Sequence, residues 1–265
     1  SHGQAAGLDR ALNLACSGLD QMAYVNLSAD EDDFIRSIEL IEAPAADSKQ
    51  ARALSLRVAE KFVGQDAVYK DGTLTLAGMP IPMGEDRRLP IRYAGPADTF
   101  PRVPMVDFLT AWRAKNIEQL KKWVGGKAVF VGPDMETDRH ATPYYAFREK
   151  GHANTAGVEI HANMLRTLLD NDFLKPVPEM ARSAAILMTA AAAGIITTAI
   201  TGWVLSGWLA GLFGILILIT HILFRNGWIL STAQLFIAVF LTVLILLVYN
   251  FLTADKRSAA FKNAV

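Results

Sequence analysis

The chain has 265 residues, and its 26 basic and 26 acidic side chains leave no formal net charge at neutral pH. A balanced chain has no overall field to draw it to nucleic acid or to acidic substrates. Its single cysteine, Cys16, excludes an internal disulfide and leaves the redox compartment open. The charges are segregated, however, because Arg225 is the only formally charged side chain in the stretch 183–252.

The first 182 residues alternate charged and apolar groups as a soluble domain does, and their periodicity predicts interleaved helices and strands. The expected helices are Ala5–Cys16, Ser48–Phe62, Met105–Trp123 and Val158–Leu169, and the expected strands are Ala23–Leu27, Leu74–Leu76, Pro90–Tyr93 and Ala128–Val131. Asp71-Gly72 favours a tight turn, so residues 68–83 are expected to form a hairpin. This order predicts an α/β domain, a mixed sheet covered by helices, over residues 1–180.

A polar loop follows the expected strand at 128–131 and carries the first candidate site, with the sequence PDMETDRHATPYY. Loops at strand ends are common places for binding residues, so Asp138, Arg139 and His140 are candidate ligand-binding residues. A structural alternative is that Asp138 accepts backbone N–H groups and pairs with Arg139, which would stabilise a turn.

The helix expected at 158–169 begins with Glu159 and His161, which complete the candidate ligand-binding set. His161 falls on an apolar stripe, which predicts a hydrogen-bonded core histidine; the stripe is Val158, His161, Ala162, Leu165, Leu168 and Leu169. The opposite, solvent-facing side is expected to hold Glu159, Asn163, Arg166 and Asp170, with favourable pairs at a spacing of four. Residues at i and i+2 on a helix point about 200° apart, which argues against a metal site at Glu159 and His161.

Motifs for catalysis and for cofactors are not found in the sequence. It lacks His-Glu-x-x-His, G-x-S-x-G, Cys-x-x-Cys, a glycine-rich phosphate loop and an aromatic-basic stripe for nucleic acid. We therefore expect no catalytic residue, no metal, no cofactor and no nucleic-acid partner.

Three apolar runs near the C-terminus are each long enough for a helix to cross a lipid bilayer. They cover about 183–200, 203–224 and 228–252, and residues 253–265 form a tail. An odd number of spans places the soluble domain and the tail on opposite sides of the membrane. Gly207 and Gly211 give the second span a face on which another helix could pack closely.

Several motifs, in their order along the chain, resemble the CHASE2 family. They are GMPIPM, LPIRYAGPADTFPRVPMVDFL, GGKAVFVG, DRHATP and GVEIHANMLRTLL, followed by the three spans. CHASE2 domains are extracytoplasmic sensory domains of bacterial membrane receptors. The resemblance implies a multi-pass protein of the bacterial inner membrane, with a periplasmic domain and a cytoplasmic C-terminus. It also implies a small-molecule, ion or protein ligand outside the cell.

The same resemblance implies a cytoplasmic output domain and a homodimer. In the family the output domain is a class III adenylate cyclase, a diguanylate cyclase, a histidine kinase or a Ser/Thr kinase. Family members usually begin with a membrane helix and a strand carrying an acidic motif, which nothing before Met22 resembles, so the N-terminal part of the domain is expected to be missing. The tail DKRSAAFKNAV resembles a juxtamembrane linker, and no catalytic domain follows it in this chain.

Three functions therefore compete. The first is a sensory input module, and the second is a structural or assembly subunit of a membrane complex that senses nothing. The third, an extracytoplasmic enzyme, is disfavoured by the missing catalytic pattern. A cyclase or kinase encoded directly after Val265 would favour the first function, and a stop codon there would favour the second.

Overall fold

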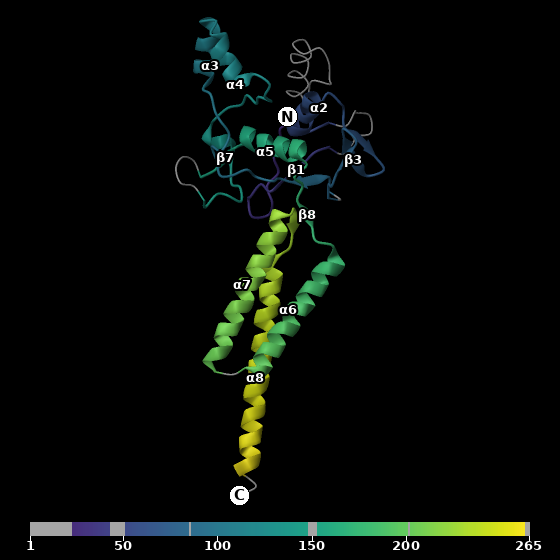
Figure 1. The fold of residues 1–265 in the computed structure, drawn as a ribbon, viewed down its shortest axis with the longest axis vertical. Coiled ribbons are helices and arrows are strands. Elements are labelled where there is room, and N and C mark those ends of the chain that lie inside the picture. Colours follow the sequence, from purple (N-terminus) through teal and green to yellow (C-terminus); the bar gives the residue numbers. More distant parts are fainter. Residues whose placement is uncertain (1–22, 43–50, 85, 148–152, 201, 263–265) are drawn as a thin grey trace, which may run out of the picture. The chain divides into compact units, whose positions relative to one another are not determined.

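The computed structural model describes residues 23–42, 51–84, 86–147, 153–200 and 202–262, with the backbone alone from residue 254 onward. The chain forms two compact units, Ser1–Phe173 and Leu174–Val265, which we describe separately (Figure 1). The helix expected at Ala5–Cys16 and the start of the one expected at Ser48–Phe62 lie outside the described residues.

The first unit mixes short strands with helices, which confirms the predicted α/β class. Its helices are α2 (Leu54–Val63), α3 (Met105–Arg113), α4 (Ile117–Val124) and α5 (Gly157–Asp170), with a 3-10 turn at Glu136–Asp138. Its strands are β1 (Ser37–Glu39), β2 (Val68–Lys70), β3 (Thr73–Leu76), β4 (Met79–Ile81), β5 (Arg88–Pro90), β6 (Arg139–His140) and β7 (Thr155–Ala156). Strands β1–β5, β2–β3–β4 and β6–β7 pair in separate small antiparallel sheets.

The predicted hairpin is confirmed, and a second tight turn extends it. Asp71 and Gly72 both have positive φ, 51° and 79°, as the tight turn between β2 and β3 requires. Ala77 and Gly78 repeat this geometry at 50° and 79° between β3 and β4. Glycine adopts a positive φ without steric cost, so a glycine in each turn favours a turn at that position.

The core lies between α2, α5 and the strands. Helices α2 and α5 pack against each other, and buried polar groups such as Glu60 and Glu159 lie on them beside a cluster of buried aliphatic side chains. The largest fully buried ones are Ile35, Ile38, Leu40, Ile41, Leu56, Leu74, Leu89, Ile160 and Met164. Helix α5 is buried on most of its surface, which makes it the central helix of this unit.

Two predicted strands lack the partners that a strand needs. Residues 128–131 form no strand and pair with no described strand, and the side chains of Val129 and Val131 are exposed. The predicted strand at 23–27 is reduced to one bridge between Tyr24 and Ala53. An alternation of apolar and polar residues predicts a strand, but the strand forms only where a neighbouring strand supplies the backbone hydrogen bonds.

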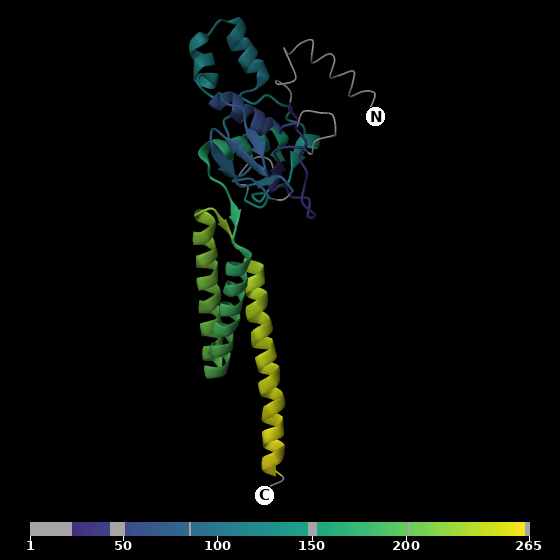
Figure 2. The ribbon, with the colours of Figure 1, turned by 90° about the vertical axis from the view of Figure 1, so that its right-hand side faces the viewer.

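The single helix predicted at 105–123 is wrong, because the structure has two. Lys115 takes a left-handed conformation with φ 52°, which ends α3 and its short C-terminal turn. The side chain of Asn116 then accepts from the backbone N–H of Gln119 and caps α4. The two helices pack mainly on each other (Figure 2) and leave several apolar side chains exposed, including Val106, Leu109 and Trp112.

The second unit holds three long apolar helices, each of the length and composition needed to cross a membrane. They are α6 (Glu179–Ala199), α7 (Trp203–Arg225) and α8 (Thr232–Lys262), with the candidate span of α8 at Thr232–Thr253. Three candidate spans are thus found where three were predicted. The third begins at Thr232 rather than near 228, because strand β9 (Trp228–Ile229) pairs with strand β8 (Lys175–Pro176).

Candidate functional site

The first turn of α5 brings one buried carboxylate against a loop that lies far away in the sequence. Glu159 is 4% exposed. Its two carboxylate oxygens accept hydrogen bonds from the backbone N–H groups of three successive residues, Asp98, Thr99 and Phe100, at 3.1, 2.9 and 3.4 Å. Nη2 of Arg102 donates to Oε2 at 2.6 Å. The expectation that Glu159 lies on a solvent-facing side is therefore wrong.

Two further polar residues on the same face of α5 continue this pattern. Oδ1 of Asn163 accepts from the backbone N–H of Ala94 at 2.8 Å, and Oγ1 of Thr167 accepts from the backbone N–H of Arg92 at 3.0 Å. Glu159, Asn163 and Thr167 are spaced by four residues and so lie along one face. Their side-chain oxygens accept hydrogen bonds from backbone N–H groups of residues 92–100, as the carbonyl groups of a neighbouring strand would. This explains why polar side chains are buried here.

The loop before α5 is tied to Glu159 through a chain of charged side chains. Nη1 of Arg102 contacts Asp134 at 3.2 Å, and Asp134 also accepts from Nη2 of the buried Arg139. Nη1 of Arg139 donates to the backbone oxygen of Asn154 at 2.9 Å. Arg139 thus pairs with Asp134, and the predicted pair of Arg139 with Asp138 is wrong.

Asp138 and His140 form the exposed part of the candidate set. The Asp138 side chain is 38% exposed, and its Oδ1 lies 3.7 Å from Nε2 of His140. A Cβ added at Gly157 would lie 2.8 Å from Oδ1 of Asp138, so a glycine at the start of α5 lets this carboxylate approach the helix. No described backbone N–H donates to Asp138, so the predicted turn-stabilising bonds are not found there.

His161 lies in the core, as the apolar stripe predicted. It is 2% exposed, and its Nε2 lies 3.2 Å from the backbone oxygen of Val25. Burial lowers the pKa of His161, while the hydrogen bond to Val25 and the charge of Asp138 partly oppose this shift. The imidazole is therefore neutral near pH 7, and its Nδ1 is buried without a hydrogen-bond partner among the described residues.

The five sequence-predicted residues thus separate into two kinds. Arg139, Glu159 and His161 are buried and bonded to the protein, whereas Asp138 and His140 are partly exposed and adjacent to each other. Sequence reasoning did not single out Arg102, although it lies within one of the quoted motifs. Among the described residues, no group of three or more potential metal-ligating His, Cys, Asp and Glu side chains is found.

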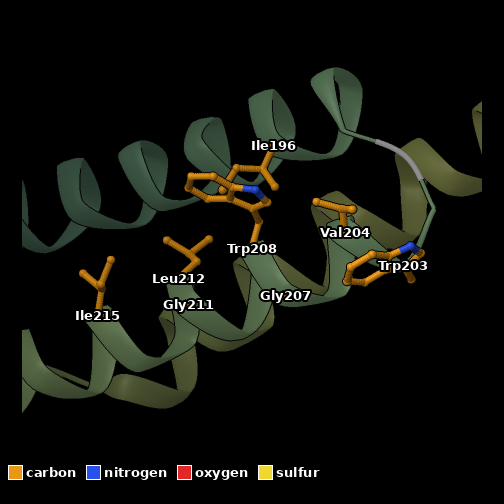
Figure 3. A pocket seen from close by; sticks show the side chains of 8 residues that line it. All are labelled: Ile196, Trp203, Val204, Gly207, Trp208, Gly211, Leu212 and Ile215. Atoms are coloured by element: carbon orange, nitrogen blue, oxygen red, sulfur yellow. The ribbon is translucent and has the colours of Figure 1, made fainter.

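The membrane helices carry a shallow apolar groove of about 390 Å³ along α7. Figure 3 shows Trp208 of α7 beside Ile196 of α6, while Gly207 and Gly211 leave the helix backbone bare between larger side chains. A Cβ added at either glycine would meet no atom within 4 Å. This face of α7 is therefore open toward the surroundings of the helix bundle.

Comparison with known protein families matches residues 5–209 of the chain to the CHASE2 domain. The match covers most of the chain and reaches into α7. Searches of the curated proteins and of the solved structures found no match. The order of the motifs, the α/β unit and the family match agree, so the chain belongs to the CHASE2 family of extracytoplasmic sensor domains and carries three candidate membrane spans.

Proposed function

We propose that this chain is the membrane-anchored input module of a bacterial receptor, with its CHASE2 unit in the periplasm. The observation that carries the proposal is the join between a sensor-family domain and three candidate spans, of which α8 continues as a helix past the end of its span. An assembly subunit would need an anchor, but it would have no use for a helix that carries movement across the membrane.

The proposed orientation places the C-terminus in the cytoplasm and the protein in the inner membrane. Three spans put the two ends of this region on opposite sides. The tail then brings Lys256, Arg257 and Lys262 to the cytoplasmic surface, where anionic lipids attract basic side chains.

The proposed output is a class III adenylate cyclase or a kinase that follows this chain. Such enzymes generally work as pairs of output domains, which supports a homodimer of the receptor. The open face at Gly207 and Gly211 supports a contact between α7 helices of two copies, because small residues let helix backbones approach closely within a membrane.

Asp138 and His140 are the proposed contacts for a periplasmic ligand. They are the two members of the candidate set with partly exposed side chains, and they lie at the N-terminal end of α5. A ligand can shift a receptor only as far as its affinity differs between two conformations. Asp138 suits this role because its carboxylate also lies close to the backbone of α5, so a ligand that draws it away would change the packing at the helix start.

The orientation is tested by labelling single cysteines in a Cys16→Ser background with an impermeant thiol reagent. Glu136→Cys, at an exposed position of the first unit, should react in intact cells, and Ser258→Cys should react only after the cells are opened. Labelling of both from the same side would exclude an odd number of spans.

The sensory role is tested by fusing a class III cyclase catalytic domain after Val265 and measuring cyclic AMP formation in membranes. Asp138→Asn and His140→Ala should change the cyclic AMP output at unchanged expression and thermal stability. Asp170→Asn, on the exposed side of α5, is the matched control and should leave the output unaltered. Equal output from all four receptors would favour the assembly role.

A further inference from the structure

The segment that joins α5 to the first membrane helix is hydrogen-bonded to a turn between the other two membrane helices. Strand β8 (Lys175–Pro176) pairs in parallel with β9 (Trp228–Ile229). The backbone N–H of Lys175 donates to Gly227 at 2.7 Å, and that of Val177 donates to Ile229 at 3.1 Å. Pro176 lies between the two donors and has no N–H of its own to satisfy.

The turn that accepts these bonds leads directly into α8. Gly227 has φ 81°, a left-handed conformation that glycine adopts freely, and it ends the chain reversal after α7. Only Leu230 and Ser231 separate β9 from the first residue of α8. A displacement of the linker therefore reaches the start of α8 through backbone hydrogen bonds and two intervening residues.

Helix α8 differs from the other membrane helices in its length. It has 31 residues, which corresponds to about 46 Å at 1.5 Å per residue. A bilayer core is about 30 Å thick, so α8 extends well past its span without a break in the helix. Helix α6, which follows the linker in the sequence, instead ends at Ala199 and is followed by α7, which returns toward β9.

Close packing along the bundle joins α8 to α6 as well. A Cβ added at Gly194 of α6 would lie 3.7 Å from Thr242 and 3.8 Å from Leu246 of α8. Ala193 of α6 and Val239 of α8 are almost fully buried in the same cluster. The linker thus connects to α8 twice, at its start through β9 and along its length through α6.

We propose that the β8–β9 pair is the coupling element of the receptor, which transmits movement of the linker to α8 directly. This inference rests on the proposed sensory function, because it names the route by which that function crosses the membrane. The pair fixes the start of α8 to the linker, so a shift of the linker moves α8 as a rod. Without the pair, movement of the linker would reach the start of α8 only through helix packing, either directly from α6 or by way of α7.

The test removes one backbone donor and leaves the chain path unchanged. Val177→Pro eliminates the N–H that donates to Ile229, and its position between two prolines already favours an extended backbone. Val177→Ala shortens the side chain but keeps the N–H, so it is the matched control. Both variants are made in the full chain with Cys16→Ser and are studied in membranes.

Hydrogen–deuterium exchange tests whether the β8–β9 pair holds the start of α8 in place. Val177→Pro should speed amide exchange in residues 227–236 by about fivefold, as expected for losing one hydrogen bond, and should leave the α6–α7 turn unaltered. A disulfide between Lys175→Cys and Trp228→Cys, which are paired residues, should restore slow exchange in the Val177→Pro chain. Unchanged exchange at 227–236 would overturn the proposal.

The fused cyclase tests whether the β8–β9 pair transmits a change at Asp138 to the output domain. The difference in output between the wild-type and Asp138→Asn receptors should disappear in the Val177→Pro background, persist with Val177→Ala and return with the disulfide. If Val177→Pro loosens the start of α8 but still passes the Asp138→Asn effect, the pair is not the route. If neither Asp138→Asn nor His140→Ala changes the cyclic AMP output while the β8–β9 pair is intact, the proposed sensory site is wrong. The hydrogen exchange of residues 227–236 then tests the coupling element by itself.

Discussion

Arg102 donates a hydrogen bond from Nη2 to Oε2 of the buried Glu159 at 2.6 Å, although 57 positions separate the two residues. This contact joins the segment before α3 to the start of α5. Because Arg102 also contacts Asp134, which pairs with Arg139, the loop that carries Asp134 and Arg139 is connected to α5 through the same arginine. The head of α5 is therefore organised by charge as well as by apolar packing.

Glu159→Gln is expected to destabilise the first unit strongly. The amide would supply one acceptor oxygen where the carboxylate supplies two, and Arg102 would lose one of its three carboxylate partners while keeping Asp98 and Asp134. Leaving the backbone N–H groups of segment 98–100 short of a buried acceptor typically costs about 1–3 kcal/mol, which thermal unfolding of the detergent-solubilised chain would measure by circular dichroism. Asp170→Asn breaks only the exposed pair with Arg166 and should change stability by less than about 0.5 kcal/mol. Equal melting temperatures for the two variants would contradict this account.

Gly157→Ala is expected to stabilise the chain less than a glycine-to-alanine change in a helix usually does, because of Asp138. Alanine favours a helix more than glycine does, but its Cβ would lie 2.8 Å from Oδ1 of Asp138. The carboxylate is the end of a flexible side chain that is 38% exposed, so it can move away at a cost of about 0.5–1 kcal/mol. In an Asp138→Ala background the same change should stabilise the chain more, so a double-mutant cycle measures the contact. Additive effects of the two substitutions on stability would show that Asp138 does not contact the Cβ added at position 157.

The elements that can be predicted from the sequence are those whose signal is local. Helix α5 follows from its apolar spacing, the β2–β3 turn from Asp71-Gly72, and the three spans from length and hydropathy. The buried position of His161 also follows from helical spacing alone. In each case, the residues that determine the structure lie within a few turns of one another in the chain.

The predictions that failed depend on contacts between distant segments. Charge and spacing placed Glu159 on a solvent-facing side, because the backbone donors at 98–100 that bury it come from about 60 positions earlier. Ala128–Val131 has the composition of a strand but no described partner. The break between α3 and α4 depends on one left-handed residue, Lys115, which apolar periodicity does not reveal.

The open face of α7 predicts how the proposed homodimer can be disrupted. Gly207→Ile together with Gly211→Ile should fill this face and reduce the fraction of crosslinked dimer in membranes several-fold. Ser206→Ile with Ala210→Ile adds side chains at the same spacing on another exposed part of α7, so it serves as the control. Dimer yields that are equal for the two double variants would remove the α7 face from the interface.

Acid is expected to weaken the first unit through His161. Its pKa is lowered in the folded chain by burial, so the unfolded chain binds a proton at a higher pH than the folded chain does. The stabilising effect of a neutral His161 is therefore complete above the ordinary pKa of about 6.5 and is lost as the pH falls from there toward the lowered value. Melting curves of the wild-type chain and of His161→Gln between pH 8 and pH 5 would measure this.

The wild-type chain should lose more stability than His161→Gln over this range, although the variant should be less stable at pH 8. At pH 8 the substitution replaces a buried ring and disturbs the contact with Val25. Below pH 6.5 the unfolded wild-type chain binds a proton at His161, whereas the folded chain must either bury the charged imidazole or leave it unprotonated. Glutamine does not titrate, so the variant has no such cost. Parallel melting curves across the range would show that His161 titrates alike in both states, and that its burial does not shift its pKa.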